Sequence, residues 1–208
     1  MQKTIILVGG FHEVIELCEL EDIKILGIVD NQKKGTYMGY EIFGNDENAQ
    51  ELFNSYKNIP VFITPHSPKK RIDLYKLYGD IGFEFISLIS SNSTISKSAK
   101  LGEGIFIQSK VNISSFTKIG NYCRINTMAN IMHDSTIGED TTIAPNTVIL
   151  GYVHIGNNCY IGANSTILPH IKIADNVIIG AGSVVTKDVH EGKIVAGNPA
   201  RELKSKKE

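Results

Sequence analysis

The 208-residue sequence has no tryptophan and only three cysteines, an odd number that does not favour a disulfide framework. No apolar run approaches the roughly 20 residues that a membrane-spanning helix requires, so we expect no membrane partner. The formal net charge is −1, from 21 basic and 22 acidic residues, and no basic excess indicates a nucleic-acid partner. The N-terminal stretch lacks the layout of a secretory signal, and we therefore expect a cytoplasmic location.

Isoleucine is abundant instead, and half of it occupies one slot of a repeat. Of the 31 isoleucines, 15 recur every sixth residue in a run of 17 hexads from Ile89 to Val185, where Leu101 and Val185 fill the other two slots. A six-residue unit accommodates one short strand and one turn, and three units close a triangular coil with isoleucine pointing inward. The repeat predicts a left-handed parallel β-helix over residues 89–190, followed by a C-terminal tail at 191–208.

Two further residue types recur within the repeat. Gly102, Gly120, Gly138 and Gly156 are spaced 18 residues apart, and we expect one corner of each coil to need the positive φ that glycine tolerates. Cys123 and Cys159 share an inward slot two coils apart, about 10 Å at the usual strand spacing. That distance is beyond the reach of a disulfide, so both cysteines are expected to fill the core.

Residues 1–88 have a different pattern, in which apolar runs alternate with helical spacing. Strands are predicted at 4–8, 23–29, 61–64 and 83–88, and helices at 11–20, 47–56 and 69–78, while 33–44 is polar and punctuated by glycine. Strands that alternate with helices predict a Rossmann-like α/β domain with a small parallel sheet.

The start of this domain resembles half of a nucleotide-binding unit. A strand leads into Gly9-Gly10 and a helix, and the second strand ends at Asp30, about 20 residues further on. There is no G-x-G-x-x-G motif, so an ordinary strand-to-helix turn remains an alternative. His12, at the start of the helix, either contacts a ligand or caps the turn.

His133 and Asp134 are the most conspicuous titratable residues within the coil. An imidazole titrates near neutrality and a neighbouring carboxylate can fix its tautomer, so the pair suits general-base catalysis, although a surface turn pair is the alternative. His154 and His170 are expected on the same flank in the two following coils. His133 and His170 are about 10 Å apart by strand spacing. Ligands of one zinc ion all lie near 2.1 Å from it, so no metal is expected.

The stretch Ile125-Asn126-Thr127-Met128-Ala129-Asn130-Ile131-Met132-His133-Asp134 resembles the active-site signature of a known family. It is similar to that of bacterial sugar acyltransferases related to sialic acid O-acetyltransferase, a group that includes N-acetyltransferases acting on nucleotide-linked 4-amino-4,6-dideoxy sugars. The uninterrupted hexads, the Rossmann-like start and the Gly197-Asn198-Pro199-Ala200-Arg201 ending fit the same family, whose members serve bacterial surface glycan biosynthesis.

The resemblance implies a homotrimer that binds acetyl-CoA, or another acyl-CoA, in a groove between subunits. His133 would be the general base, Asp134 would orient it, and Asn126 would line the site. The backbone N–H of Gly151 would lie near the thioester carbonyl, and the pantetheine arm would be held around Gly162, Ala163, Gly180 and Ala181. The nucleotide-activated amino sugar would dock at Gly9, Gly10, His12 and Asp30. The charges of Lys187, Arg201 and Lys204 suit contacts with the phosphates of CoA, although solvated charges near the tail are the alternative.

The sequence departs from the family at positions that affect specificity. Phe11 and Glu13 flank His12 where the family has glycine, which leaves the type of nucleotide open. Thr142 replaces a second histidine near the acyl group, so the acyl preference is open too. Four functions are therefore weighed: N-acylation of a nucleotide-linked amino sugar, O-acetylation of sialic acid or a related sugar, zinc-dependent hydration of the carbonic anhydrase type, and sugar-nucleotide binding without catalysis.

Overall fold

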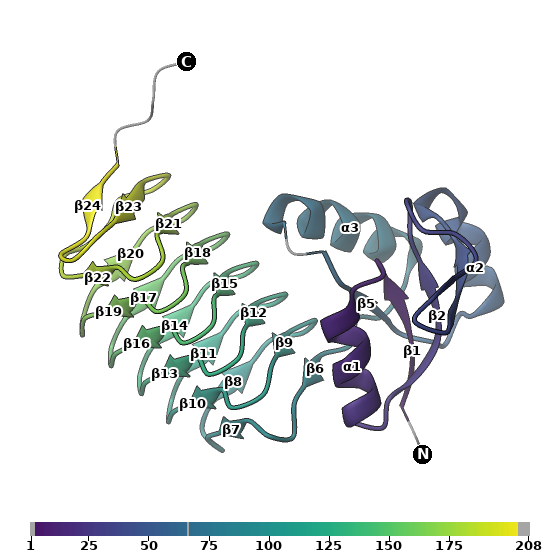
Figure 1. Ribbon diagram of the computed structural model, residues 1–208, viewed down its shortest axis with the longest axis horizontal. Helices are drawn as coiled ribbons and strands as arrows, with labels where there is room; N and C mark the ends of the chain where they lie inside the picture. Colours follow the sequence, from purple (N-terminus) through teal and green to yellow (C-terminus); the bar gives the residue numbers. More distant parts are fainter. Residues whose placement is uncertain (1–2, 66, 204–208) are drawn as a thin grey trace. The chain divides into compact units, whose positions relative to one another are not determined.

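The computed structural model describes residues 3–65 and 67–203 and divides into two compact units, 1–88 and 89–208 (Figure 1). Within the described ranges, no helix has the length and apolar character needed to span a bilayer. The boundary between the units lies where the hexad repeat begins. A sugar-nucleotide-binding role for the first unit remains a prediction.

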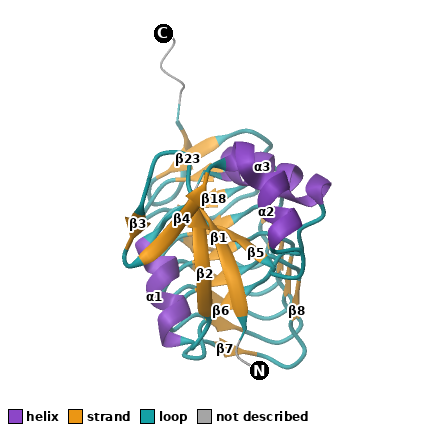
Figure 2. Cartoon of the chain, turned by 90° about the vertical axis from the view of Figure 1, so that its right-hand side faces the viewer, coloured by secondary structure: helices purple, strands orange, loops and turns teal. Residues whose placement is uncertain are grey.

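The first unit is a five-stranded sheet with helices on both sides. The sheet order is β3-β4-β2-β1-β5, and α1 lies on one side while α2 and α3 lie on the other (Figure 2). The strands are β1 (Thr4–Val8), β2 (Lys24–Val29), β3 (Thr36–Tyr37), β4 (Tyr40–Gly44) and β5 (Val61–Ile63). The helices are α1 (His12–Leu20), the 3-10 helix η1 (Asp46–Asn48), α2 (Ala49–Ser55) and α3 (Pro68–Ile81).

The order in which strands are added to this sheet reverses at β1: β2 and β4 follow on one side of β1, and β5 is added on the other side. Strand β1 pairs in parallel with β2 on one side and with β5 on the other. Ligands of open α/β sheets bind at the carboxyl ends of the strands where the strand order reverses. This edge of the sheet, formed by Gly9 and Gly10 after β1 and by Thr64 after β5, is therefore where a ligand site is expected.

Two parts of the first unit differ from the prediction. The polar segment 33–44 contains the antiparallel pair β3 and β4 at the edge of the sheet, where fewer apolar residues are needed. The strand predicted at 83–88 is wrong: Phe85 makes one isolated bridge to Val61, and the regular strand that follows, β6 (Leu88–Ile89), belongs to the coil. The apolar residues of this segment contribute to packing around α3 rather than to a strand, as Phe85 does against Tyr75.

The second unit is a left-handed parallel β-helix, as predicted, with three flat faces. The first face contains β7 (Thr94–Ile95), β10 (Asn112–Ile113), β13 (Asn130–Ile131), β16 (Val148–Ile149), β19 (Thr166–Ile167) and β22 (Val184–Val185). The second contains β8 (Lys100–Leu101), β11 (Lys118–Ile119), β14 (Thr136–Ile137), β17 (His154–Ile155) and β20 (Lys172–Ile173). The third contains β6, β9 (Phe106–Ile107), β12 (Arg124–Ile125), β15 (Thr142–Ile143), β18 (Tyr160–Ile161), β21 (Ile178–Ile179), β23 (Ile194–Ala196) and β24 (Arg201–Glu202).

The inward slot of the repeat forms the core of the coil. Strands one coil apart pair in register, so that Ile113 lies beside Ile131 and Ile131 beside Ile149. The isoleucines of successive coils form one continuous buried cluster, in which Cys123 and Cys159 are also fully buried. The role of these cysteines as core residues is confirmed.

The left-handed backbone positions lie elsewhere than the glycine spacing predicts. Twelve non-glycine residues at intervals of six have φ between +53° and +65°: Lys110, Phe116, Tyr122, Met128, Asp134, Asp140, Asn146, Tyr152, Asn158, Asn164, His170 and Asn176. None of Gly102, Gly120, Gly138 and Gly156 has a positive φ. These glycines are needed for close approach instead, because a Cβ on Gly138 would stand 2.5 Å from the backbone carbon of Gly156 in the next coil.

The C-terminal segment is also more ordered than the predicted tail. Strand β23 extends the third face by pairing with β21, and β24 pairs antiparallel with β23. Ile178 pairs with Ile194, 16 residues away, whereas the earlier coils have a period of 18. This shorter last turn removes the hexad spacing, so the repeat pattern does not reveal β23. Residues 204–208 lie outside the described part of the chain.

Candidate active site

His133 lies in the corner between the first and second faces of the coil, which we call the first corner. It follows β13, and its Nδ1 lies 2.9 Å from Oδ2 of Asp134. The Asp134 backbone is held in the left-handed conformation by an N–H that donates to Ser115 O at 3.0 Å. Both side chains remain accessible, with 48% of His133 and 36% of Asp134 exposed. With Nδ1 bound to the carboxylate, Nε2 is the nitrogen available to accept a proton.

Gly151 lies directly beneath the His133 ring in the next coil. A Cβ at this position would stand 2.8 Å from Cε1 and 3.0 Å from Nε2 of His133. The Gly151 carbonyl accepts a hydrogen bond from the N–H of His170 at 3.1 Å. The structure therefore brings together Gly151 and His133, two residues that the family resemblance assigns to one site.

Two further aromatic rings complete this corner. Tyr152 meets His133 edge-on, with ring centroids 5.3 Å apart and an interplanar angle of 88°. On its other side, Tyr152 stacks on His170, with centroids 4.9 Å apart and planes within 5° of parallel. Sequence reasoning missed Tyr152, although Asp134, Tyr152 and His170 are spaced by 18 residues and so occupy one column.

The predicted gathering of three histidines on one flank is only partly correct. His170 joins the first corner through Tyr152, but His154 lies on β17 of the second face, where its Nδ1 is 2.7 Å from Thr136 Oγ1. Among the residues that the structure describes, no three histidine, cysteine or acidic side chains lie close enough to hold a metal ion.

The other predicted coil residues lie in a different corner, between the third and first faces, which we call the third corner. It contains Asn126, Gly162, Ala163, Gly180 and Ala181. The N–H groups of Gly162 and Gly180 donate to Ile179 O and Val195 O at 2.9 and 2.8 Å, so the coil already uses them. Contacts of this corner with a pantetheine arm remain a prediction.

The first and third corners are at opposite ends of the first face. Asn126 precedes β13 and His133 follows it, so the full width of the face separates them within one chain. A single coil therefore does not bring all of the predicted catalytic and acyl-CoA residues into one site.

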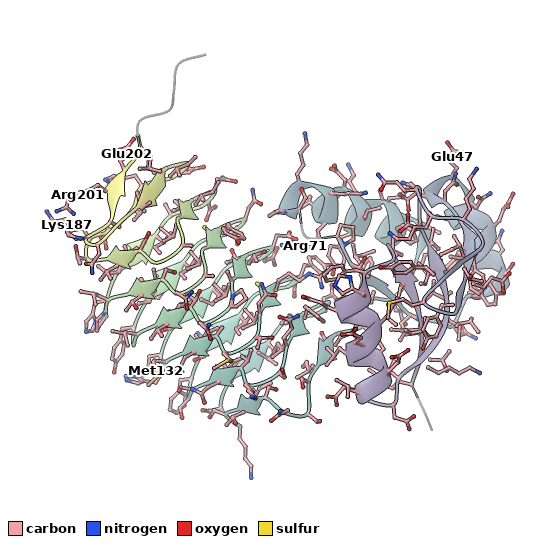
Figure 3. The ribbon with its side chains drawn as sticks, viewed as in Figure 1. Glu47, Arg71, Met132, Lys187, Arg201 and Glu202 are labelled. Carbon is pink, nitrogen blue, oxygen red and sulfur yellow. The ribbon has the colours of Figure 1, made fainter. Side chains whose placement is uncertain are left out.

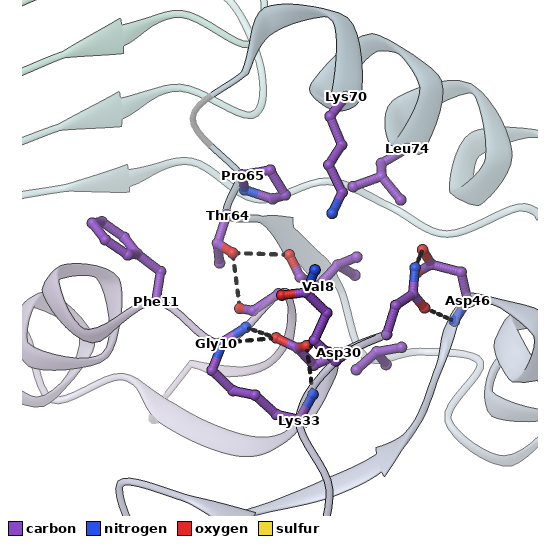
Figure 4. A pocket seen from close by; sticks show the side chains of 14 residues that line it. Val8, Gly10, Phe11, Asp30, Lys33, Asp46, Thr64, Pro65, Lys70 and Leu74 are labelled. Atoms are coloured by element: carbon purple, nitrogen blue, oxygen red, sulfur yellow. Dashed lines mark hydrogen bonds and ion pairs between the residues drawn. The ribbon is translucent and has the colours of Figure 1, made fainter.

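The first unit contains a cavity of about 210 Å³ at the switch point of its sheet (Figure 4). Gly9 (φ +97°), Gly10 and Asp30 line it, as does Thr64, whose hydroxyl donates to Gly9 O at 2.8 Å. A Cβ on Gly9 would collide with this hydroxyl, so glycine is required here. His12 is exposed at the start of α1 and is outside the cavity lining, whereas Phe11 is part of it.

Asp30 is held by four donors in this cavity. Oδ1 accepts from the N–H groups of Gln32 and Lys33 at 2.8 and 2.9 Å, and Oδ2 accepts from Gly10 N at 2.8 Å and from Lys33 Nζ at 3.3 Å. Burial raises the pKa of Asp30, but these hydrogen bonds outweigh it and lower the pKa to about 2. A carboxylate has about four acceptor positions, so Asp30 is fully used in tying the ends of β1 and β2 together.

Two lysines that the sequence did not single out supply positive charge to the cavity. Lys33 lies over the ring of Tyr37, 4.7 Å from its centroid, and bonds Asp30. Lys70, in the first turn of α3, extends its ammonium group toward the cavity (Figure 4). The positive charge of these two lysines suits a phosphate-containing ligand.

The C-terminal end of the coil has a second cationic region. Lys187, Lys193 and Arg201 line a cavity of about 280 Å³ there, and Lys187 and Arg201 project from this end of the coil (Figure 3). Lys193 is already paired with Glu202, at 2.7 Å. Lys204, the third predicted phosphate contact, lies outside the described residues.

Comparison with known proteins shows that part of the coil is similar to a repeat of bacterial transferases. Residues 116–151 and 152–187 match the family model "Bacterial transferase hexapeptide (six repeats)". No curated protein sequence matches the chain. A solved structure of a mutant GDP-perosamine N-acetyl transferase from Caulobacter crescentus, in complex with CoA and GDP-perosamine, is 25% identical. The match covers 99% of this chain and 98% of that chain with a TM-score of 0.92.

Two other solved structures match along nearly their whole length. WeeI from Acinetobacter baumannii is 27% identical, with 97% of this chain and 100% of that chain covered and a TM-score of 0.83. The acetyltransferase domain of PglB from Neisseria gonorrhoeae is 23% identical, with 97% and 100% covered and a TM-score of 0.89, and at this identity it supports the fold alone.

Proposed function

We propose that this chain, an acyl-CoA-dependent acyltransferase of the hexapeptide-repeat superfamily, acylates the amino group of a nucleotide-linked 4-amino-4,6-dideoxy sugar. The observation that carries the proposal is the His133–Asp134 pair over Gly151, in a chain whose fold follows that of a GDP-perosamine N-acetyl transferase from end to end. Acetyl is the acyl group assigned in this proposal.

In the proposed reaction His133 acts as the general base. The lone pair of the sugar amine attacks the thioester carbon of acyl-CoA while Nε2 of neutral His133 accepts the amine proton. Asp134 stabilises the resulting imidazolium through Nδ1, which is 2.9 Å from its carboxylate. The tetrahedral oxyanion is stabilised by a backbone donor, to which we assign the N–H of Gly151. Collapse of the intermediate breaks the C–S bond, and the CoA thiolate takes the proton back from His133.

The proposed active enzyme is a homotrimer with sites between subunits. The separation of the first and third corners within one chain supports this arrangement. In a trimer, the β-helix of a neighbouring subunit can place its own third corner next to the His133 of the first subunit. Exposed apolar side chains on three adjacent strands of the third face also support it: Tyr160, Ile178 and Ile194 are 43%, 42% and 45% exposed. A contiguous apolar stripe of this kind favours a protein interface.

The sugar nucleotide is assigned to the cavity of the first unit. Its polar lining around Gly9, Gly10 and Asp30 lies at the sheet's switch point, and Lys33 and Lys70 add positive charge suited to a diphosphate. His12, exposed at the start of α1 next to Phe11 of the cavity lining, is assigned as a contact of the sugar. A cytoplasmic location and a role in bacterial surface glycan biosynthesis are part of this proposal.

The test is release of CoA thiol by the purified protein with a panel of amino-sugar nucleotides, free sialic acid and several acyl-CoA chain lengths. We expect turnover with an amino-sugar nucleotide and a loss of at least about 100-fold in kcat for His133→Ala. Near-normal turnover by His133→Ala would refute the base. Turnover with free sialic acid alone would replace N-acylation by O-acetylation, and nucleotide binding without acyl-CoA binding would favour a non-catalytic protein.

A further inference from the structure

The first corner contains a column of three aromatic rings, of which only His133 takes part in the proposed reaction. His133, Tyr152 and His170 follow one another along the coil axis, with ring centroids 5.3 and 4.9 Å apart. Tyr152 is 47% exposed, so burial does not explain its presence at this position. Its backbone is left-handed (φ +61°). Asparagine has this conformation at other corners of the β-helix, at Asn146, Asn158, Asn164 and Asn176.

We infer that Tyr152 is a positioning residue for His133, and that His170 in turn fixes Tyr152. The inference rests on the proposed role of His133 as base. It names a residue that sets the orientation of the base without exchanging a proton itself.

The constraints on the His133 ring show why a third contact matters. Asp134 restrains the ring through Nδ1, and Gly151 lies beneath one face of it. Because 48% of the His133 side chain is exposed, these two contacts leave the ring free to turn outward toward solvent. Tyr152 contacts the ring at 88°, an edge-to-face geometry that aromatic pairs favour and that resists this rotation.

Tyr152 itself needs a support, which His170 provides. The two rings are within 5° of parallel, and the backbone N–H of His170 donates to Gly151 O at 3.1 Å. Gly151 therefore contacts His133 with its Cα region and holds His170 with its carbonyl. The three rings and this glycine form one connected unit in which His133 is the exposed end.

The experiment compares kcat and KM for both substrates in Tyr152→Asn, Tyr152→Phe and His170→Asn. Asparagine suits the left-handed backbone and removes the ring, whereas phenylalanine keeps the ring and removes only the hydroxyl. We expect Tyr152→Asn to lower kcat about tenfold with both KM values within about twofold of wild type. Tyr152→Phe should retain wild-type kcat within about twofold, and His170→Asn should lose about threefold.

Tyr122→Asn is the matched control, because Tyr122 has the same left-handed backbone (φ +62°) in a corner away from His133. It should keep wild-type kcat. The inference is overturned if Tyr152→Asn keeps kcat within about twofold, if Tyr152→Phe loses as much as Tyr152→Asn, if the change is confined to KM, or if Tyr122→Asn loses as much. Activity of His133→Ala, measured alongside, would instead overturn the proposed function, so the two failures are distinguishable.

Discussion

The His133 ring rests on Gly151 so closely that no side chain fits between them: a Cβ on Gly151 would stand 2.8 Å from Cε1 of His133. The two residues are one coil apart, so the repeat itself places the glycine under the histidine. The ring is the movable partner in this contact, since its side chain is 48% exposed.

Gly151→Ala should therefore damage catalysis without unfolding the protein. The added methyl group pushes the imidazole away from its position over the backbone, and we expect kcat to fall about 10- to 100-fold with little change in the unfolding midpoint. Gly79→Ala is the control, because a Cβ there meets nothing nearer than Phe85 at 3.5 Å. Steady-state kinetics check the prediction, and a kcat within about twofold of wild type would show that the contact does not orient the base.

Gly138→Ala should have the opposite profile, with loss of stability as its main effect. Its Cβ would stand 2.5 Å from the backbone carbon of Gly156, and no side chain can move to relieve the contact. Forcing the coils apart should cost about 2 kcal/mol, a typical figure for overpacking, and lower the thermal midpoint by roughly 5 °C. Calorimetry at fixed protein concentration measures this shift, and an unchanged midpoint would contradict the close-approach explanation for the glycine column.

The coil was predictable because one physical requirement recurs every six residues. Each face needs one branched side chain pointing inward, and a polar residue in place of Ile131 or Ile149 would bury a polar group among apolar side chains. The corner conformations were not predictable in the same way. Left-handed backbone at Tyr152 or Phe116 is imposed by the coil's closure and its hydrogen bonds, against the residues' own preferences.

The candidate site also has some features that the sequence predicts and others that depend on the folded chain. His133 and Asp134 are adjacent at a predicted turn, so the sequence indicated a pair, and the structure supplies the 2.9 Å contact between Nδ1 and Oδ2. Lys70 reaches the first unit's cavity only because α3 begins beside the end of β5, which no local pattern indicates. Asp30 was correctly placed at the end of β2, but its four hydrogen-bond donors, which leave no free acceptor, depend on how the β1–α1 turn and the 30–33 turn fold together.

Asp30→Asn should make the first unit less stable in a pH-dependent manner. The pKa of Asp30 is lowered from 3.8 to about 2 on folding, so its carboxylate contributes stability above pH 3.8 that is lost as the pH falls through about 2. The difference in unfolding free energy between wild type and Asp30→Asn should therefore be largest near neutral pH and shrink across that window. Denaturant titrations at a series of pH values measure it, and a constant difference would rule out a charged Asp30 as the stabilising group.

Lys70→Ala should weaken nucleotide binding selectively. Lys70 and Lys69 are neighbours in the same helix turn and both are exposed, but only Lys70 lines the cavity assigned to the sugar nucleotide. We expect the Kd for GDP or UDP to rise about threefold to fivefold in Lys70→Ala, as for a partly exposed charge pair, and to stay unchanged in Lys69→Ala. Because salt screens such charges, the difference should fall at about 0.5 M salt. Calorimetric titration with both nucleotides tests this. Equal effects of the two variants would mean that general surface charge, rather than the cavity at the end of β1, attracts the diphosphate.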